Sequence, residues 1–188
     1  MSGDAKISAV LETLLAAKLV QQDEQGVGYA KSGMHHELLC PAEAIRAAAT
    51  VYREAGFFLE MVTCLDLRET ARRMRLVYTF NRLGPAERHR LFVDLAEVKP
   101  FEPSPNVKSN ATPATDPPAL PQCAPSISSV YPAADWFERE IFDMFGVQFS
   151  EHPNLKRLLL PEDADFHALL RDFGRVEDAD QGEGGRGV

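Results

Sequence analysis

The residues best suited to chemistry lie close together in the stretch DWFEREIFDMFGVQF, residues 135–149. Glu138, Arg139, Glu140 and Asp143 stand there among one tryptophan and several phenylalanines. Paired carboxylates can perform general acid–base catalysis. The same side chains can also shape a structural helix or a surface for another protein. Because no nucleophile, metal-ligand set or phosphate loop lies nearby in the sequence, a structural or partner-binding role is favoured.

The spacing within this stretch predicts a helix over residues 136–146. Asp135 suits the N-cap, Glu138 completes a capping box, and Gly146 suits the position just past the helix end. One face is an apolar arc, and Glu138 projects beside its phenylalanines. Members of that arc are Phe137, Ile141, Met144 and Phe145. The opposite face is charged, with Trp136 at its edge. It consists of Arg139, Glu140 and Asp143, and it could hold a pair between Arg139 and Asp143.

A helix of about three turns is too short to be stable alone, so it must dock. The sequence leaves two uses of the aromatic arc equally open: burial against the chain's own sheet, or burial against another chain. An exposed Arg139–Asp143 pair would contribute less than about 1 kcal/mol. At a buried interface, the same pair would mainly set register and partner choice.

The residues after this helix predict an irregular path. His152 precedes Pro153, a pair that favours a turn or an extended backbone. Four leucines then lie between residues 155 and 160, and either this chain or a neighbour can bury them. His152 can titrate near neutrality, although a structural role is favoured.

Elsewhere, His35, His36 and Cys40 suggest a metal site. Zinc needs four ligands, or three and a water, and the sequence shows no further ligand, so a solvated loop is favoured. The cysteines at positions 40, 64 and 123 form no CxxC motif, which indicates reduced thiols rather than an iron–sulfur site. We therefore expect no metal, no catalytic residue and no cofactor in this chain.

Composition and charge limit the kinds of partner that this chain is expected to bind. The formal net charge is −8 with a pI near 5.1, which argues against nucleic-acid binding. No apolar run reaches the roughly 18 residues of a membrane span, and the N-terminus lacks the basic region of a signal peptide. Any membrane association is therefore expected to be indirect, through other proteins.

The elements that must position these residues are helices and strands in alternation. Apolar periodicity predicts a helix over 4–20, capped by Asp4, and a second helix from Pro41 to Gly56. The segment 29–40 reads as a loop entering a short strand, and three further strands are predicted. These cover residues 57–67, 72–80 and 89–98. The expected fold class is α+β: a mixed or antiparallel sheet with helices packed on one face, plus an extended C-terminal segment.

Proline marks the domain organisation. Nine of the 13 prolines lie between Pro100 and Pro132, so residues 99–125 are expected to be a linker that supplies no sheet hydrogen bonds. We expect an α+β domain over 1–98 and a disordered tail over 174–188. Between linker and tail, residues 126–173 are expected to form a signature helix and an extended partner-binding arm.

Residues 131–163 resemble the signature region of the 30 kDa subunit family of respiratory complex I, known in bacteria as the C subunit of NADH–quinone oxidoreductase. The matching motif residues are Glu138, Arg139, Glu140, Asp143, Phe145, Gly146, Phe149, His152 and Pro153, followed by Leu155, Arg157, Leu158 and Pro161. Looser similarity extends upstream through residues 57–69 and 72–82.

This resemblance implies a non-catalytic scaffold subunit of the peripheral arm, which carries electrons from NADH to quinone coupled to proton translocation. It implies contact with the 49 kDa-type subunit, also called the D subunit, and with other peripheral-arm subunits at the cytoplasmic face of the bacterial inner membrane. NADH, FMN, iron–sulfur clusters and quinone would belong to the complex rather than to this chain. The implied partner-binding residues are Trp136, Glu138, Arg139, Glu140, Asp143, Phe145, Gly146, Phe149, His152, Pro153 and Arg157.

The sequence departs from the family pattern in two places. EDADFHALLRDF lacks the usual tryptophan and glycine, and the proline-rich stretch is unusually long. Three other readings stay open: the equivalent subunit of a membrane-bound energy-converting nickel–iron hydrogenase, a free-standing acid–base enzyme, and a simple adaptor.

Overall fold

The computed structural model describes residues 9–22, 29–84, 86–95, 123–171 and 173. Three predictions therefore fall outside the described residues. These are the Asp4 cap, the linker over 99–122 and the tail over 174–188.

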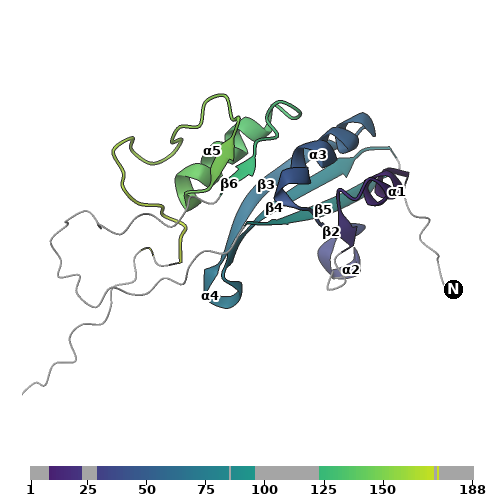
Figure 1. Cartoon of the computed structure of the whole chain (residues 1–188), viewed down its shortest axis with the longest axis horizontal. Helices are drawn as coiled ribbons and strands as arrows, with labels where there is room; N and C mark the ends of the chain where they lie inside the picture. The colour runs from purple at the N-terminus through teal and green to yellow at the C-terminus, as the bar shows by residue number, and fades with distance from the viewer. Residues whose placement is uncertain (1–8, 23–28, 85, 96–122, 172, 174–188) are drawn as a thin grey trace, which may run out of the picture.

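A five-stranded mixed sheet forms the centre of the fold, with strand order β1-β2-β5-β4-β3 (Figure 1). Parallel pairing joins β2 to β5, and the other neighbours are antiparallel. The strands are β1 (Gln21–Gln22), β2 (His36–Leu39), β3 (Phe58–Leu67), β4 (Arg73–Arg82) and β5 (Glu87–Asp94). The predicted short strand and the three long ones are thus confirmed, with ends shifted by a few residues.

Alternation along β5 shows why these residues form a strand. Its burial alternates residue by residue, so Leu91 and Val93 point into the core while Arg90 and Phe92 point to the other face. Side chains two residues apart share one face of a strand. On the second face, Arg90 pairs with Glu37 of β2 at 2.9 Å.

Helices precede or connect the strands. They are α1 (Ala9–Ala16), α2 (Tyr29–Ser32), α3 (Ile45–Glu54) and α4 (Arg68–Ala71), with a 3-10 turn, η1, at Ala42–Ala44. Two of them, α1 and α3, contribute buried residues to the core. The helix predicted from Pro41 thus starts as that 3-10 turn and becomes α-helical at Ile45. It ends before Gly56, which has a positive φ of 81° that suits glycine.

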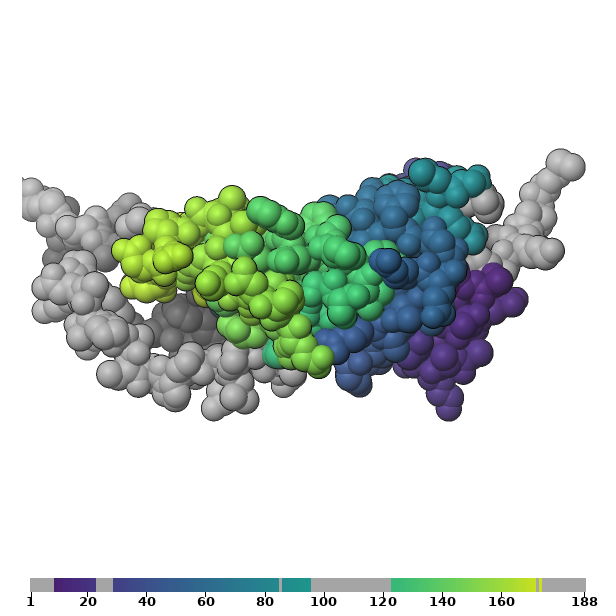
Figure 2. Space-filling view, turned by 90° about the horizontal axis from the view of Figure 1, so that it is seen from above, coloured from purple at the N-terminus to yellow at the C-terminus, as the bar shows by residue number. Residues whose placement is uncertain are grey.

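The signature helix is α5 (Ala134–Phe145), and it packs on the same side of the sheet as α3 (Figure 1). Buried Ile127, Tyr131 and Ile141 belong to one continuous core with Leu91 of the sheet and Tyr52 of α3. Figure 2 shows residues from 123 onward, green to yellow, directly against the blue residues of the first domain. The arc therefore packs against the chain's own core, with Ile141 buried and Phe137 and Phe145 partly exposed.

Residues 123–125 differ from the linker prediction. They form β6 (Cys123–Pro125), which pairs in parallel with β7 (Gln148–Ser150) just after the signature helix. Pro125 at the strand end is compatible with this, because prolines are tolerated where a strand terminates. None of the described helices is long and apolar enough to cross a membrane.

Candidate functional site

The signature helix starts differently from the sequence prediction. Ala133 is the N-cap and the helix begins at Ala134, with no side-chain cap hydrogen bond, so the Asp135–Glu138 capping box is wrong. The C-terminal end is as predicted: Gly146 has φ 76° and its N–H donates to the carbonyl of Phe142. A Cβ on Gly146 would lie 2.8 Å from the ring of His167, so both the backbone conformation and the space favour glycine there.

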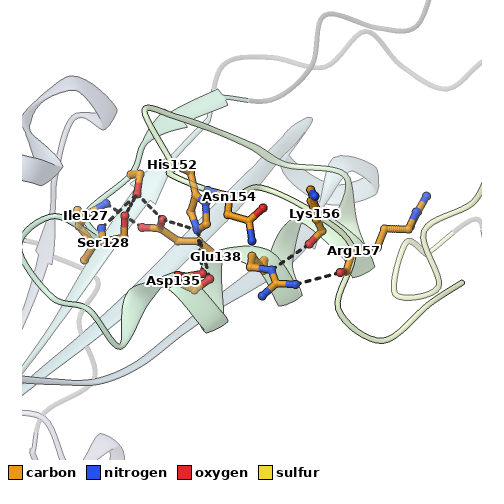
Figure 3. Close-up of polar contacts among 10 residues, drawn as sticks. Ile127, Ser128, Asp135, Glu138, His152, Asn154, Lys156 and Arg157 are labelled. Atoms are coloured by element: carbon orange, nitrogen blue, oxygen red, sulfur yellow. Dashed lines mark hydrogen bonds and ion pairs between the residues drawn. The ribbon is translucent and has the colours of Figure 1, made fainter. Parts of the chain in front are cut away.

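Glu138 is a buried anchor rather than a cap. Its carboxylate, 0% exposed, accepts hydrogen bonds from the Ser126 hydroxyl at 2.6 Å and the Ile127 N–H at 2.8 Å (Figure 3). Burial raises the pKa of Glu138 to about 7, although these two hydrogen bonds oppose the shift. Glu138 thereby ties the helix to the segment that leads into it.

His152 lies on the same cluster. Its Nδ1 accepts from the N–H of Asn154 at 3.1 Å, so its Nε2 carries the proton. That Nε2 lies 3.3 Å from the Asp135 carbonyl, 3.5 Å from Asp135 Oδ1 and 3.8 Å from Glu138 Oε2 (Figure 3). The predicted His152–Pro153 turn thus returns the chain to the first turn of the helix, with exposed Pro153 at the surface.

Asp143 is the most heavily bonded side chain of the site. Its Oδ2 accepts the backbone N–H groups of Leu158, Leu159 and Leu160 at 2.7–3.0 Å. Its Oδ1 accepts from Arg157 at 2.7 Å. Burial alone would raise the pKa of Asp143, but these four hydrogen bonds outweigh it and hold the pKa well below its usual range.

The possible Arg139–Asp143 pair is not formed, because each residue binds the arm separately. We define the arm as residues 151–171, which follow β7. Arg139 donates to the carbonyls of Lys156 and Arg157 at 3.1 and 3.2 Å (Figure 3). Its guanidinium also lies 5.5 Å from the centre of the Trp136 ring. Arg139 and Asp143 therefore hold two successive parts of one irregular segment.

Further contacts fix the rest of the arm. Arg157 donates to the carbonyl of Ala164 at 2.6 Å, and the ring of His167 bonds the carbonyl of Asp143 at 2.9 Å. At the far end, the N–H of Arg171 donates to Asp66 of β3 at 3.0 Å. These contacts hold the arm at several points along a path that has no helix or strand.

The remaining signature residues divide between core and surface. Phe149 is buried, and Phe145 packs against the core while partly exposed. Glu140 is exposed, and Trp136 is 62% exposed. The arm adds Leu159 at 65% and Leu169 at 54% exposure. Large apolar side chains therefore stand at the surface of a segment whose backbone is held in place.

Sequence reasoning missed Ser126, the Ile127 N–H and Asp66. Their partners lie 12, 11 and 105 residues away in the chain, and no local pattern marks such contacts.

The structure does not bring together the three residues that suggested a metal site in the sequence. His35 is exposed and Cys40 is buried, whereas His36 lies near Glu87 and His89 of β5.

Fold and site together define the class: an α+β domain that presents a pre-shaped C-terminal arm. Comparisons agree with this. Residues 38–178 match the family described as respiratory-chain NADH dehydrogenase, 30 Kd subunit. The chain belongs to that family.

Individual relatives are similar over shorter stretches. The C subunit of NADH-quinone oxidoreductase from Rhodobacter capsulatus is 36% identical over 112 residues, 60% of this chain and 45% of that protein. The C/D subunit of NADH-quinone oxidoreductase from Methylococcus capsulatus is 50% identical over 62 residues, 33% of this chain and 10% of that protein. The chain thus spans less than half the length of these relatives.

A solved structure of similar fold is the trypsin-resistant fragment (1-134) of Nqo5. The match covers 78% of this chain and 99% of that fragment, with a TM-score of 0.53 and 24% sequence identity. This similarity confirms the α+β fold.

Replacing Asp143 by asparagine is expected to loosen the arm. One oxygen becomes an amide that cannot accept the N–H groups, and hydrogen bonds to a charged acceptor contribute about 1.5–3 kcal/mol each. We expect a free energy of unfolding lower by about 2 kcal/mol or more, and tryptic cleavage after Lys156 several-fold faster. Glu140→Gln, on the exposed side of the same helix, is the control. Equal cleavage rates in both variants would contradict this role of Asp143.

Glu138 predicts a pH dependence of stability. Because its folded-state pKa is raised to about 7, its contribution is fully present below the unfolded pKa near 4.5 and is lost as pH rises through 7. The free energy of unfolding of the wild type should therefore fall between pH 5 and pH 7.5. Glu138→Gln should flatten that fall, as measured by urea denaturation at each pH. A fall of the same size in both proteins would show that another group is responsible.

Proposed function

We propose that this chain is a non-catalytic scaffold subunit of the peripheral arm of NADH–quinone oxidoreductase, supporting electron transfer from NADH to quinone coupled to proton translocation. Family membership supports the complex, and the arm supports the scaffold role. The observation that carries the proposal is the set of three hydrogen bonds that the backbone N–H groups of Leu158, Leu159 and Leu160 donate to Asp143. They hold a non-regular segment in one shape before any partner binds, which lowers the entropy cost of binding.

The proposed partner is the 49 kDa-type subunit, or D subunit, together with other peripheral-arm subunits. The relative from Methylococcus capsulatus is designated C/D, which joins the two in one name. Trp136, Leu159 and Leu169 supply exposed apolar area around the arm. Tryptophan is enriched among residues that dominate binding energy at interfaces. We therefore assign Trp136 and the outer face of the arm to that contact.

Both buried carboxylates have structural uses that support a role without catalysis. Glu138 binds Ser126 and Ile127, and Asp143 binds the arm. In this proposal NADH, FMN, iron–sulfur clusters and quinone belong to other subunits. The complex would place this chain at the cytoplasmic face of the inner membrane, attached through its partners.

Two other functions remain as hypotheses. The equivalent subunit of an energy-converting nickel–iron hydrogenase would share this fold, but the relatives described above are named for NADH–quinone oxidoreductase. A free-standing acid–base enzyme would need its carboxylates open to a substrate, whereas Glu138 and Asp143 are each 0% exposed. The first proposal is therefore favoured.

Purification of the tagged chain from membranes tests the proposed function. A 49 kDa-type subunit should co-purify with NADH:quinone reductase activity, and chaotropic salt should release the chain. Recovery with a nickel–iron hydrogenase would favour the second hypothesis. Catalytic turnover by the isolated chain would overturn the scaffold role.

Arg139→Ala is expected to impair assembly more than folding. The side chain holds the carbonyls of Lys156 and Arg157 but lies at the surface, so the α+β domain should keep its thermal transition within a few degrees. We expect recovery of the assembled complex to fall several-fold, as measured by native gel electrophoresis of solubilised membranes. Glu140→Ala, one residue along the helix, is the matched control. Normal yield with Arg139→Ala would contradict the proposed role of the arm.

A further inference from the structure

A second cluster of potential ligands lies on the inner face of the sheet, far along the chain from the signature motif. It consists of His36 of β2 and of Glu87 and His89 of β5. His36 is directly opposite His89 in the parallel register, so both rings project to the same face. Glu87 is two residues before His89 and shares that face for the same reason. Sheet geometry alone therefore brings the three side chains together.

The three side chains are close enough to share one ion. One ligand atom from each lies within 4.8 Å of the others, and Glu87 Oε1 lies 2.8 Å from His89 Nε2. Ligands of a tetrahedral zinc ion stand about 2.0–2.2 Å from the metal, which separates them by roughly 3.4 Å. To reach that spacing, the widest separation must shorten by up to about 1.4 Å, and the 2.8 Å contact between Glu87 and His89 must open by about 0.6 Å. Rotation of His36, which is only half-buried, can supply most of the shortening.

Neighbouring groups orient two of the three ligands. Tyr52 OH lies 2.9 Å from Nδ1 of His89, and Arg82 donates to Oε2 of Glu87 at 2.5 Å. Metal-binding histidines usually bond a partner through the other ring nitrogen, and ligating carboxylates are themselves hydrogen-bonded. Both outer partners are thus in place, and both leave His89 Nε2 and Glu87 Oε1 directed toward each other.

We propose that His36, Glu87 and His89 form a zinc-binding site, with water as the fourth ligand. Two imidazoles and one carboxylate with a water are an established zinc ligand set. Imidazole nitrogen also favours Zn²⁺ over Mg²⁺ or Ca²⁺, which prefer oxygen ligands. The ion would join β2 to β5 across their parallel pairing.

The protons of His89 and Tyr52 can rearrange to admit the ion. Nε2 of His89 now carries the proton that it donates to Glu87, because a carboxylate only accepts. For zinc to bind, Nε2 releases that proton to solvent and so frees its lone pair, while Nδ1 takes up one proton from solvent and the neutral ring changes tautomer. Nδ1 then donates to the Tyr52 hydroxyl oxygen, and that hydroxyl turns its own hydrogen away. The charge of His89 does not change, and the nearby Arg82 remains paired with Glu87.

The sequence indicated only part of this site. His35, His36 and Cys40 suggested metal binding, but no other ligand was visible in that stretch. The missing ligands lie about 50 residues downstream, since register places His89 opposite His36. Cys40 is buried with its thiol directed to the Pro41 carbonyl, outside the cluster.

Zinc titration of the purified, metal-free full chain tests the proposal. We expect one Zn²⁺ per chain by competition with a chromophoric chelator. His36→Ala should weaken binding by roughly 100-fold or more, since loss of an outer-shell partner alone costs 10–100-fold. His35→Ala is the matched control, because this adjacent and exposed histidine lies outside the cluster.

A second measurement covers the case in which a variant fails to fold. Co²⁺ bound to the wild type should give tetrahedral d–d absorption without a thiolate charge-transfer band, and Cys40→Ser should leave that spectrum unchanged. Absence of one-to-one Zn²⁺ binding would overturn the proposal. Equal affinity in His36→Ala and His35→Ala, or a thiolate band lost in Cys40→Ser, would also overturn it.

Discussion

One buried carboxylate, Asp143, organises the arm that follows the signature helix. Three consecutive backbone N–H groups and one guanidinium converge on it. A segment without helix or strand has no internal pattern to satisfy its backbone groups, so it needs fixed external partners. Asp143 provides the acceptor for the N–H groups, and Arg139 provides a donor for the carbonyls just before them. The charged motif is thus a template for the shape of the arm.

The helix that carries this template is itself fixed from two sides. Ile141 and Phe149 bury against the sheet, and Glu138 accepts hydrogen bonds from the segment just before the helix. A charge placed wholly inside a core is costly, and the two hydrogen bonds of Glu138 offset only part of that cost, since burial still raises its pKa to about 7. The motif therefore contacts three parts of the chain: the sheet, the segment before the helix, and the arm. Its aromatic side chains serve the first contact and its charged side chains serve the other two.

The fold was predictable from the sequence where one residue pattern decides the structure. Strand-forming residues bounded by turn signals identified the long strands, and Gly56 and Gly146 marked the ends of two helices. Prediction failed where residues far apart in the sequence determine the local structure. Asp135 looks like a cap, yet the N-cap is Ala133, two residues earlier, and residues 123–125 join β7 despite their proline-rich context. Contact between Glu138 and Ser126, or between Asp66 and Arg171, depends on tertiary packing that no local spacing encodes.

The central claim is that the arm is already folded on its own domain before a partner arrives. Amide hydrogen exchange of Leu158, Leu159 and Leu160 in the isolated full chain tests it most directly. We expect these three amides to exchange at least about tenfold more slowly than unstructured peptide amides, because each donates to a buried carboxylate. Exchange at the unstructured rate, with protection gained only in the assembled complex, would contradict the claim.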